Sequence, residues 1–302
     1  MASAEKACEL IARAAKGGAQ LAVFPEAFIP GYPDWVWVIP PGSKKPLLDK
    51  MNATLLANSV AVPDDVTDTL SQAAKTAGIQ VAIGIHERNV EASGSSLYNT
   101  LLFIGADGKI MGKHRKLMPT GAERLVWAQG DGSTLDVFDT PIGKISGLLC
   151  WENFMPLARN AVYAMGAQIH VAPTWDSSDG WLVTMQHIAK EGGMFVISCC
   201  MAVHIDDIPD RYEFKQLYPE GKEWINKGNS CVVGPRGQII AGPLVERQDI
   251  LFADIDLGEI ATWKWLFDVS GHYARPDVFK FGVNRSTNPM LDEHTDNAAE
   301  SD

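Results

Sequence analysis

Apolar residues recur at helical spacing in the first part of the chain. Ala7, Leu10, Ile11 and Ala14 share one face of residues 2–16, and glycine follows, so this segment is predicted to be a helix that ends there. The same kind of pattern predicts helices over residues 66–77, 154–165 and 181–190.

Short apolar runs bounded by turn residues predict the strands. They cover residues 21–24, 79–86, 98–104, 109–111, 144–149, 169–172, 194–201, 230–233, 238–240 and 251–255. Asp107-Gly108 and Pro235-Arg236-Gly237 favour hairpins. Because helices alternate with strands and hairpins are mixed in, we expect an α/β domain with mixed sheets that helices cover.

Domain boundaries are not marked by any low-complexity linker. We expect one domain over residues 1–290, followed by a polar, acidic and mobile tail over 291–302. A loop rich in proline, glycine and aromatic residues is predicted over 26–46, and long irregular loops of this kind often line functional sites.

Composition narrows the classes of partner. The formal charge is −11, which argues against nucleic acid or an anionic membrane as the main partner. No apolar run is long enough for a transmembrane helix, and MASAEKACEL lacks the pattern of a signal peptide. The chain has five cysteines, an odd number, and most are far apart in the sequence, which fits reduced thiols in a cytoplasmic protein. The sequence contains neither a CxxC nor an HExxH motif, so no metal site is predicted.

Three predicted strands run directly into a reactive side chain. These side chains are Glu26, Lys116 and Cys150. Because sites in α/β proteins gather where strands end, a carboxylate, an ammonium and a thiol are expected to meet. The carboxylate could take the thiol proton, and the ammonium could stabilise the charge that develops on a substrate.

Each of these residues also has a purely structural interpretation. Cys150 alone is typical of a buried small apolar residue, and Glu26 of a loop charge. Lys116 ends a basic cluster that would ordinarily face solvent, while Glu123 could pair with Arg124 or cap a helix. Taken one at a time, the structural interpretations are favoured.

Longer motifs change that balance. The segments LAVFPEAFIPGYP, GKHRKLMPTGAERLVWAQGDGS and GLLCWENFMPLARNAVYAMGAQIHVAPTWD resemble the nitrilase branch of the carbon–nitrogen hydrolase superfamily, and KGNSCVVGPRGQIIAGP and FDVSGHYARPDVF extend the resemblance. It covers residues 4–281. It implies a single domain folded as an α-β-β-α four-layer sandwich, with neither a metal nor an organic cofactor.

The resemblance also implies a role for each matched residue. Glu26 in FPEAF is implied to be the general base, Lys116 in HRKLMPT to stabilise the tetrahedral intermediate, and Cys150 in CWEN to be the nucleophile. Glu123, seven residues after the lysine, is implied to orient Lys116 and assist proton transfer.

The expected activity is hydrolysis of an organic nitrile to a carboxylic acid and ammonia, with amide as a side product. Trp151-Glu152 after the cysteine favours nitrilases over the amidase and N-carbamoyl hydrolase branches, and a cyanide-degrading enzyme remains an alternative. A catalytically silent binding or scaffold protein would be expected to have lost part of the Glu26, Lys116, Glu123 and Cys150 set. A Cys-His protease is disfavoured because no histidine stands in a matching context.

Aromatic residues close to these motifs could shape an apolar cleft for the substrate. We expect Tyr32, Trp127, Trp151 and Trp175 to contribute, although most of the nine tryptophans must pack in a core or an interface. The resemblance implies a homo-oligomer, either a dimer or a larger spiral.

One departure from the resemblance concerns the start of the chain. Members of the superfamily usually have a strand before the helix that is predicted here from residue 2. No such strand is predicted here, so we expect unpaired backbone groups in a sheet or a rearranged sheet.

Overall fold

Helices α1 (Ala2–Lys16) and α4 (Asp65–Ala77) form where amphipathic spacing predicts them. The computed structural model describes residues 2–91 and 93–289. In α4, the Asp64 carboxylate accepts the N–H groups of Val66 and Thr67, and Gly78 ends the helix with a left-handed backbone. The apolar faces of α1 and α4 pack on one side of a four-stranded sheet. The helices and this sheet form the first half of the sandwich.

This first sheet has the strand order β1-β2-β3-β4. Its members are β1 (Leu21–Val23), β2 (Gln80–Arg88), β3 (Leu97–Ile104) and β4 (Ile110–Arg115). β1 and β2 are parallel, and the other neighbours are antiparallel. Every residue of β3 is buried, because helices cover one face of the sheet and the second sheet covers the other.

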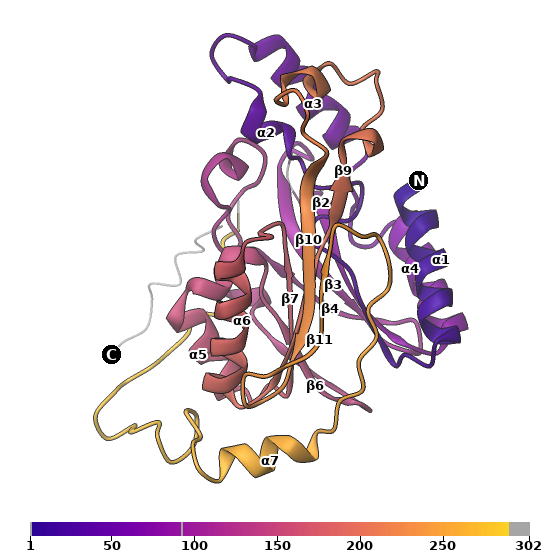
Figure 1. Ribbon diagram of the computed structural model, residues 1–302. Helices are drawn as coiled ribbons and strands as arrows, with labels where there is room; N and C mark the ends of the chain where they lie inside the picture. Colours follow the sequence, from indigo (N-terminus) through magenta and orange to yellow (C-terminus); the bar gives the residue numbers. More distant parts are fainter. Residues whose placement is uncertain (1, 92, 290–302) are drawn as a thin grey trace, which may run out of the picture.

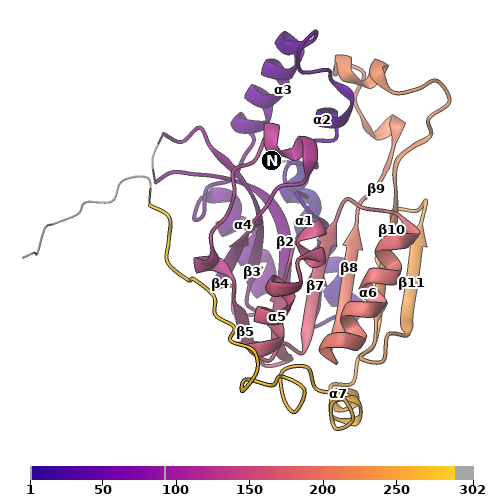
Figure 2. The same ribbon diagram turned by 90° about the vertical axis from the view of Figure 1, so that its left-hand side faces the viewer.

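The second sheet has seven strands in the order β11-β10-β8-β7-β6-β5, with β9 paired to β10. They are β5 (Val137–Thr140), β6 (Gly143–Gly147), β7 (Ile169–Thr174), β8 (Phe195–Cys200), β9 (Ala202–His204), β10 (Trp224–Val233) and β11 (Ile239–Val245). Helices α5 (Pro156–Ala164) and α6 (Asp179–Gly192) cover its outer face (Figure 2).

The two sheets face each other across an apolar layer. Leu101 and Phe103 of the first sheet meet Ile145, Ile169 and Val171 of the second. Figure 1 shows the sheets in the middle, with α5 and α6 on one side and α1 and α4 on the other. The α/β fold with the expected α-β-β-α order of layers is therefore confirmed.

A smaller cluster closes one end of the sandwich. It joins α2 (Trp35–Val38) and α3 (Lys45–Ala57) to the 3-10 helix η5 (Glu213–Leu217) through Trp35, Met51 and Phe214. The remaining short helices are η1 (Gly121–Leu125), η2 (Gly132–Thr134), η3 (Cys150–Phe154), η4 (Ile205–Asp207) and α7 (Gly258–Lys264).

Several predicted elements need correction. β4 does not stop at residue 111 but continues to Arg115. The helix predicted over 154–165 begins at Pro156, because residue 154 ends the 3-10 helix η3. The loop predicted over 26–46 contains the short helix α2. The polar tail expected over 291–302 lies outside the described residues. None of the described helices combines the length and the apolar character needed to cross a membrane.

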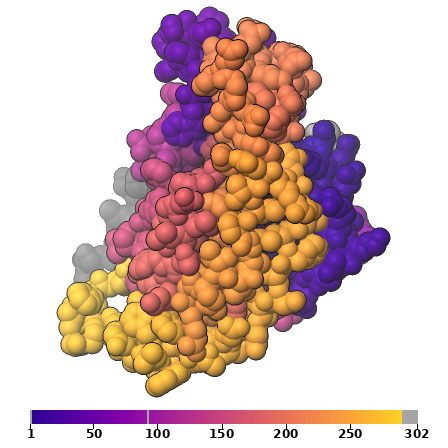
Figure 3. Space-filling view, viewed as in Figure 1, coloured from indigo at the N-terminus to yellow at the C-terminus, as the bar shows by residue number. Residues whose placement is uncertain are grey.

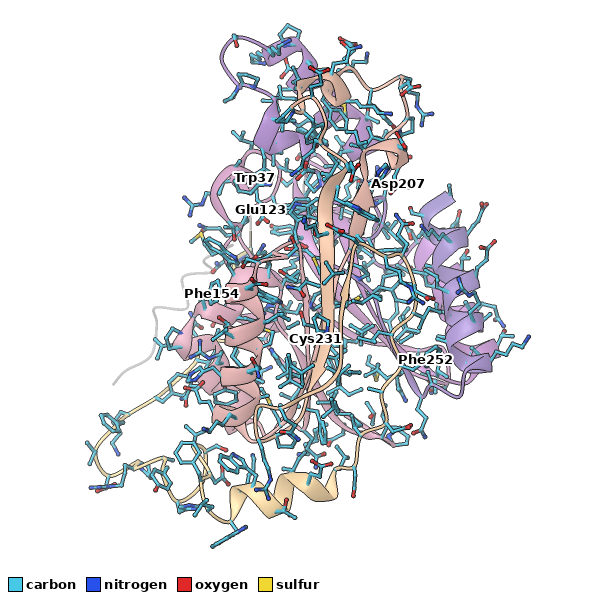
Figure 4. All side chains as sticks on the ribbon, in the orientation of Figure 1. Trp37, Glu123, Phe154, Asp207, Cys231 and Phe252 are labelled. Carbon is cyan, nitrogen blue, oxygen red and sulfur yellow. The ribbon has the colours of Figure 1, made fainter. Side chains whose placement is uncertain are left out.

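The strand predicted over residues 251–255 is not formed. This segment and β1 both line one cavity of ≈ 1480 Å³. Among the described residues β1 pairs with β2 alone, so it is an edge of the first sheet. An apolar run becomes a strand only where a neighbouring backbone lies within hydrogen-bonding reach, and among the described residues no strand pairs with residues 251–255. The segment lies instead beside α1 (Figure 3), with Phe252 directed toward that helix (Figure 4). The Phe252 ring lies against Gly17.

Candidate active site

Glu26 is brought into the interior by the turn that follows β1. Its side chain is fully buried. The turn lies so close to β2 that a Cβ atom on Gly84 would stand 2.4 Å from the carbonyl oxygen of Pro25 and from the amide nitrogen of Ala27. A glycine at residue 84 therefore permits the close approach that places Glu26.

Lys116 follows the last residue of β4 and is also fully buried. Its N–H donates to the carbonyl of Asn99 at 2.8 Å, which extends the pairing with β3. Lys113 and Arg115 point to the opposite face and donate to Glu87. Strand alternation thus divides the basic cluster, and only part of it faces outward.

Cys150 lies in a tight turn after β6, where η3 begins. Its backbone has φ +52°, a left-handed conformation that costs a non-glycine residue about 1–3 kcal/mol. The amide of Asn153 donates to the carbonyls of Leu148 and Cys150, both at 2.9 Å. The Thr174 hydroxyl, at the end of β7, donates to the Cys150 Sγ at 3.3 Å.

These strand ends meet at a single centre. The Lys116 Nζ donates to Glu26 Oε1 at 2.8 Å and to Glu123 Oε2 at 2.7 Å. One ligand-type atom from each of Glu26, Glu123 and Cys150 lies within 4.8 Å of the others. The ammonium therefore bridges two carboxylates next to the thiol. All four predicted side chains are brought together, and each is at most 4 % exposed.

Burial controls the protonation of this centre. It raises the pKa of Glu26 to about 7, with the Lys116 charge opposing and the Glu123 charge adding to the rise. Burial and the Glu26 charge raise the pKa of Cys150 to about 12, although Lys116 acts against them. At neutral pH the free site thus holds a protonated thiol beside a carboxyl group that can accept its proton.

Glu123 is held by donors other than Lys116. It lies in η1, where the N–H of Thr120 donates to Oε2 at 2.6 Å. The Tyr32 hydroxyl donates to Oε1 at 2.7 Å. Figure 4 shows Glu123 beside Trp37, whose indole N–H donates to the same hydroxyl at 3.3 Å.

Three of the four predicted aromatic residues surround this centre. Tyr32 stacks on Trp175 with ring centroids 4.3 Å apart and meets Trp127 edge to face. The Lys116 Nζ lies 5.9 Å from the Trp127 ring. Trp151 differs, because its side chain is 48 % exposed and its indole N–H donates to Asp176.

The site also contains groups that could ligate a metal, namely the two carboxylates and the thiol. The Lys116 ammonium already occupies one oxygen of each carboxylate. A cation added to this centre would meet that charge at short range.

Two functional neighbours were missed in the sequence. The Asn99 amide donates to Glu26 Oε1 at 2.7 Å, and Thr174 contacts the thiol. A signal for Asn99 existed, because Asn99 and Thr100 interrupt the apolar run of β3, and polar residues in a buried strand need specific partners. Thr174 gave no comparable signal at the end of its strand.

Comparisons with known proteins point to one family. A model of the carbon–nitrogen hydrolase family matches residues 1–265. An aliphatic nitrilase of Sinorhizobium fredii (strain HH103) is 45% identical over 284 residues, which cover 94% of this chain and 90% of that protein. Nitrilase 2 of Arabidopsis thaliana is 42% identical over 94% of this chain and 84% of that protein. A bifunctional nitrilase/nitrile hydratase of Nicotiana tabacum is 42% identical over 99% of this chain and 86% of that protein.

Solved structures share the fold at lower identity. The carbon–nitrogen hydrolase of Helicobacter pylori G27 superposes with a TM-score of 0.67 over 92% of both chains, at 20% identity. An amidase of Nesterenkonia sp. superposes with a TM-score of 0.65 over 87% of this chain and 90% of that one, at 22% identity.

Proposed function

This chain belongs to the carbon–nitrogen hydrolase family, and from that premise we propose that Cys150, Glu26 and Lys116 carry out nitrile hydrolysis. The chain is a nitrilase, which converts an organic nitrile to the carboxylic acid and ammonia. One observation carries the assignment of residues, namely the buried centre where the Lys116 ammonium bridges Glu26 and Glu123 beside the Cys150 thiol.

In the first step the Cys150 sulfur attacks the nitrile carbon. Glu26 accepts the thiol proton and returns a proton to the nitrile nitrogen, so the product is a covalent thioimidate. The Lys116 ammonium stabilises the negative charge on that nitrogen during the attack. The Trp151 N–H is a second donor, because N–H groups in the first turn of a helix lack intrahelical acceptors.

Water completes the reaction in two additions. Glu26 takes a proton from the first water as it adds to the thioimidate, and the nitrogen leaves as ammonia to give a thioester. A second water releases the carboxylic acid and restores the thiol. One nitrile and two waters thus give one acid and one ammonia.

Amide is the proposed side product. If the carbon–sulfur bond of the first tetrahedral adduct breaks before the carbon–nitrogen bond, the amide leaves and Cys150 is restored. Relatives described as bifunctional nitrilase/nitrile hydratases support this branch. Amidase, N-carbamoyl hydrolase and cyanide-degrading activities are not favoured, because the similar curated proteins are nitrilases.

Tyr32, Trp127 and Trp175 are proposed to line the part of the site that receives the substrate's organic group. The Tyr32 ring contacts both tryptophan rings, its hydroxyl donates to Glu123, and the Lys116 Nζ lies near the Trp127 ring. Trp151 is proposed to contact the substrate through its backbone N–H and not through its indole, because the indole faces outward.

We also propose that the chain forms homo-oligomers through the outer face of α5 and α6. This face exposes Phe154, Met155, Leu157 and Val183. Light scattering should give a mass of at least two chains, and a monomer at working concentration would contradict it. A cytoplasmic location is proposed because all five cysteines are free, and fractionation of source cells would test it.

The activity is tested with a panel of aliphatic and aromatic nitriles, free cyanide and the matching amides. Ammonia, acid and amide are measured separately. We expect ammonia and acid from at least one nitrile, and no turnover by Cys150→Ala although this variant keeps the native circular dichroism spectrum. Cys231→Ala is a matched control, because Cys231 is buried in the α5–α6 core away from the centre. Ammonia from amides alone, or normal turnover by Cys150→Ala, would contradict the proposal.

A further inference from the structure

We propose that Glu152 is a positioning residue that sets the separation between Lys116 and Cys150, an inference that rests on the function proposed for those two residues. Its carboxylate is 1 % exposed. Oε1 accepts the N–H of Leu117 at 2.6 Å, and Oε2 accepts the N–H of Leu149 at 2.7 Å. Leu117 follows Lys116 in the chain, and Leu149 precedes Cys150.

These two backbone positions belong to different sheets. Lys116 follows β4 of the first sheet, whereas Cys150 follows β6 of the second. The sheets meet through apolar side chains, and such contacts have little directionality. The carboxylate of Glu152 adds two directional, charge-assisted hydrogen bonds across this boundary. It therefore fixes the relation between the sheets at the point where the reaction needs it.

His114 keeps this carboxylate ionised. Its Nδ1 lies 3.2 Å from the carbonyl oxygen of Thr134, and its Nε2 lies 3.0 Å from Glu152 Oε1. Both partners are acceptors, so both ring nitrogens carry protons and His114 is an imidazolium. Burial opposes both charges, but their attraction lowers the pKa of Glu152 and raises the pKa of His114.

The strained turn at Cys150 explains why a positioning residue is needed there. A left-handed backbone at a non-glycine residue persists only where the surroundings hold it. Glu152 holds the turn from the Leu149 side, and Asn153 holds the carbonyls of Leu148 and Cys150. Both side chains are buried, whereas Trp151, which precedes them in the chain, is half exposed.

Glu152→Asp tests the proposal with the smallest change. Aspartate keeps the charge, but its carboxylate is withdrawn by one carbon–carbon bond and is too short to reach both Leu117 and Leu149. Because a misplacement of about 1 Å can cost roughly 100-fold in rate, kcat should fall by about that factor while KM changes little. Glu152→Gln, which replaces one acceptor oxygen with an N–H donor, should have a similar effect.

The rate of Cys150 alkylation by iodoacetamide as a function of pH is the second measurement. Lys116 lowers the pKa of this thiol, so a larger separation should shift the alkylation profile to higher pH. All kcat values are expressed per Cys150 thiol in the folded fraction isolated by gel filtration, which removes chains that fail to fold.

Glu87→Gln is the matched control. Glu87 is another buried carboxylate that accepts hydrogen bonds from cations, but its partners Lys113 and Arg115 point away from the centre. It should lower the melting temperature and leave the kcat per thiol and the alkylation profile unchanged.

Two outcomes overturn the inference. One is a wild-type kcat per thiol in Glu152→Asp, whatever happens to its melting temperature. The other is the same loss of kcat in Glu87→Gln. Failure of the proposed function is a separate result, because turnover by Cys150→Ala would refute that function while the alkylation profiles still report the separation between Lys116 and Cys150.

Discussion

At the scale of single residues, the two oxygens of Glu26 have different tasks. Oε1 accepts hydrogen bonds from Lys116 and Asn99, while Oε2 is buried and has no partner among the described residues. A buried acceptor without a donor is costly, and such cases often have a functional reason. We infer that Oε2 is the atom that receives the proton of Cys150 or of water.

The first prediction concerns pH. Glu26 accepts a proton only when it is ionised, and burial raises its pKa to about 7. The value of kcat/KM should therefore rise with pH through about 7, and it should fall by about tenfold per pH unit well below that value. A pH–rate profile with substrate well below KM checks this. A profile that is flat between pH 5 and 8 would contradict the role of Glu26 as base.

The second prediction concerns the hydroxyl of Tyr32. Tyr32→Phe keeps the stack on Trp175 but removes the donor to Glu123 Oε1. A hydrogen bond to a charged group contributes about 1.5–3 kcal/mol, so kcat/KM should fall roughly 10- to 100-fold.

Tyr163→Phe is the matched control for this variant. It removes a similar bond, from the Tyr163 hydroxyl to Glu191 at 2.8 Å, on the outer side of the second sheet. It should lower the melting temperature without changing kcat/KM. Equal kinetics for the two variants would show that the Tyr32 hydroxyl is not part of the site.

At the scale of elements, close backbone approach places Glu26, the proposed general base. The Glu26 turn lies against β2 at Gly84, and the next residues add to this contact because the N–H of Ile29 donates to the Gly84 carbonyl at 3.2 Å. The position of the carboxylate thus depends on a residue without a side chain, 58 positions away in the chain.

The third prediction follows from that contact. Gly84→Ala should cost about 1–3 kcal/mol in the free energy of unfolding, because the new Cβ meets backbone atoms that cannot rotate away. It should also lower kcat, since relief of the clash displaces Glu26. Urea denaturation and steady-state kinetics measure both effects. Gly42→Ala is the control, because a Cβ there has open space, and wild-type values for Gly84→Ala would refute this account.

At the scale of the whole molecule, a cavity opens at one edge of the sandwich. The ≈ 1480 Å³ cavity lies between the β1 edge and residues 251–255. The hydrogen bonds found among the described residues include none from the backbone N–H groups of these five. A segment with apolar composition and no backbone partners is held by side-chain packing alone.

The fourth prediction tests that description. Backbone amides of residues 251–255 should exchange with deuterium much faster than those of β10, which pair with β8 at Cys231, Val232 and Val233. Hydrogen exchange with mass spectrometry resolves the two segments. Slow exchange in residues 251–255 would mean that they pair as a strand in solution.

Local pattern determined much of this protein. Amphipathic spacing located α1 and α4, and apolar runs located β2, β3, β7 and β8, because hydrophobic periodicity depends only on neighbours in the chain. Pattern failed where the outcome depends on distant partners. Residues 251–255 are apolar enough for a strand, but among the described residues no strand pairs with them. The pattern of residues 113–116 predicts a solvated segment, whereas strand alternation buries His114 and Lys116.

The candidate site residues were also chosen from the sequence, since a glutamate, a lysine and a cysteine each follow a strand within long motifs. Only the tertiary structure placed Glu26, Glu123 and Cys150 around the ammonium of Lys116, and only it disclosed the contacts that Asn99, Glu152 and Gly84 make with this centre or its backbone. The physical reason is that these contacts join two sheets and residues far apart in the chain. Hydrogen-bond geometry and close backbone approach are properties of the packed molecule, and no local pattern records them.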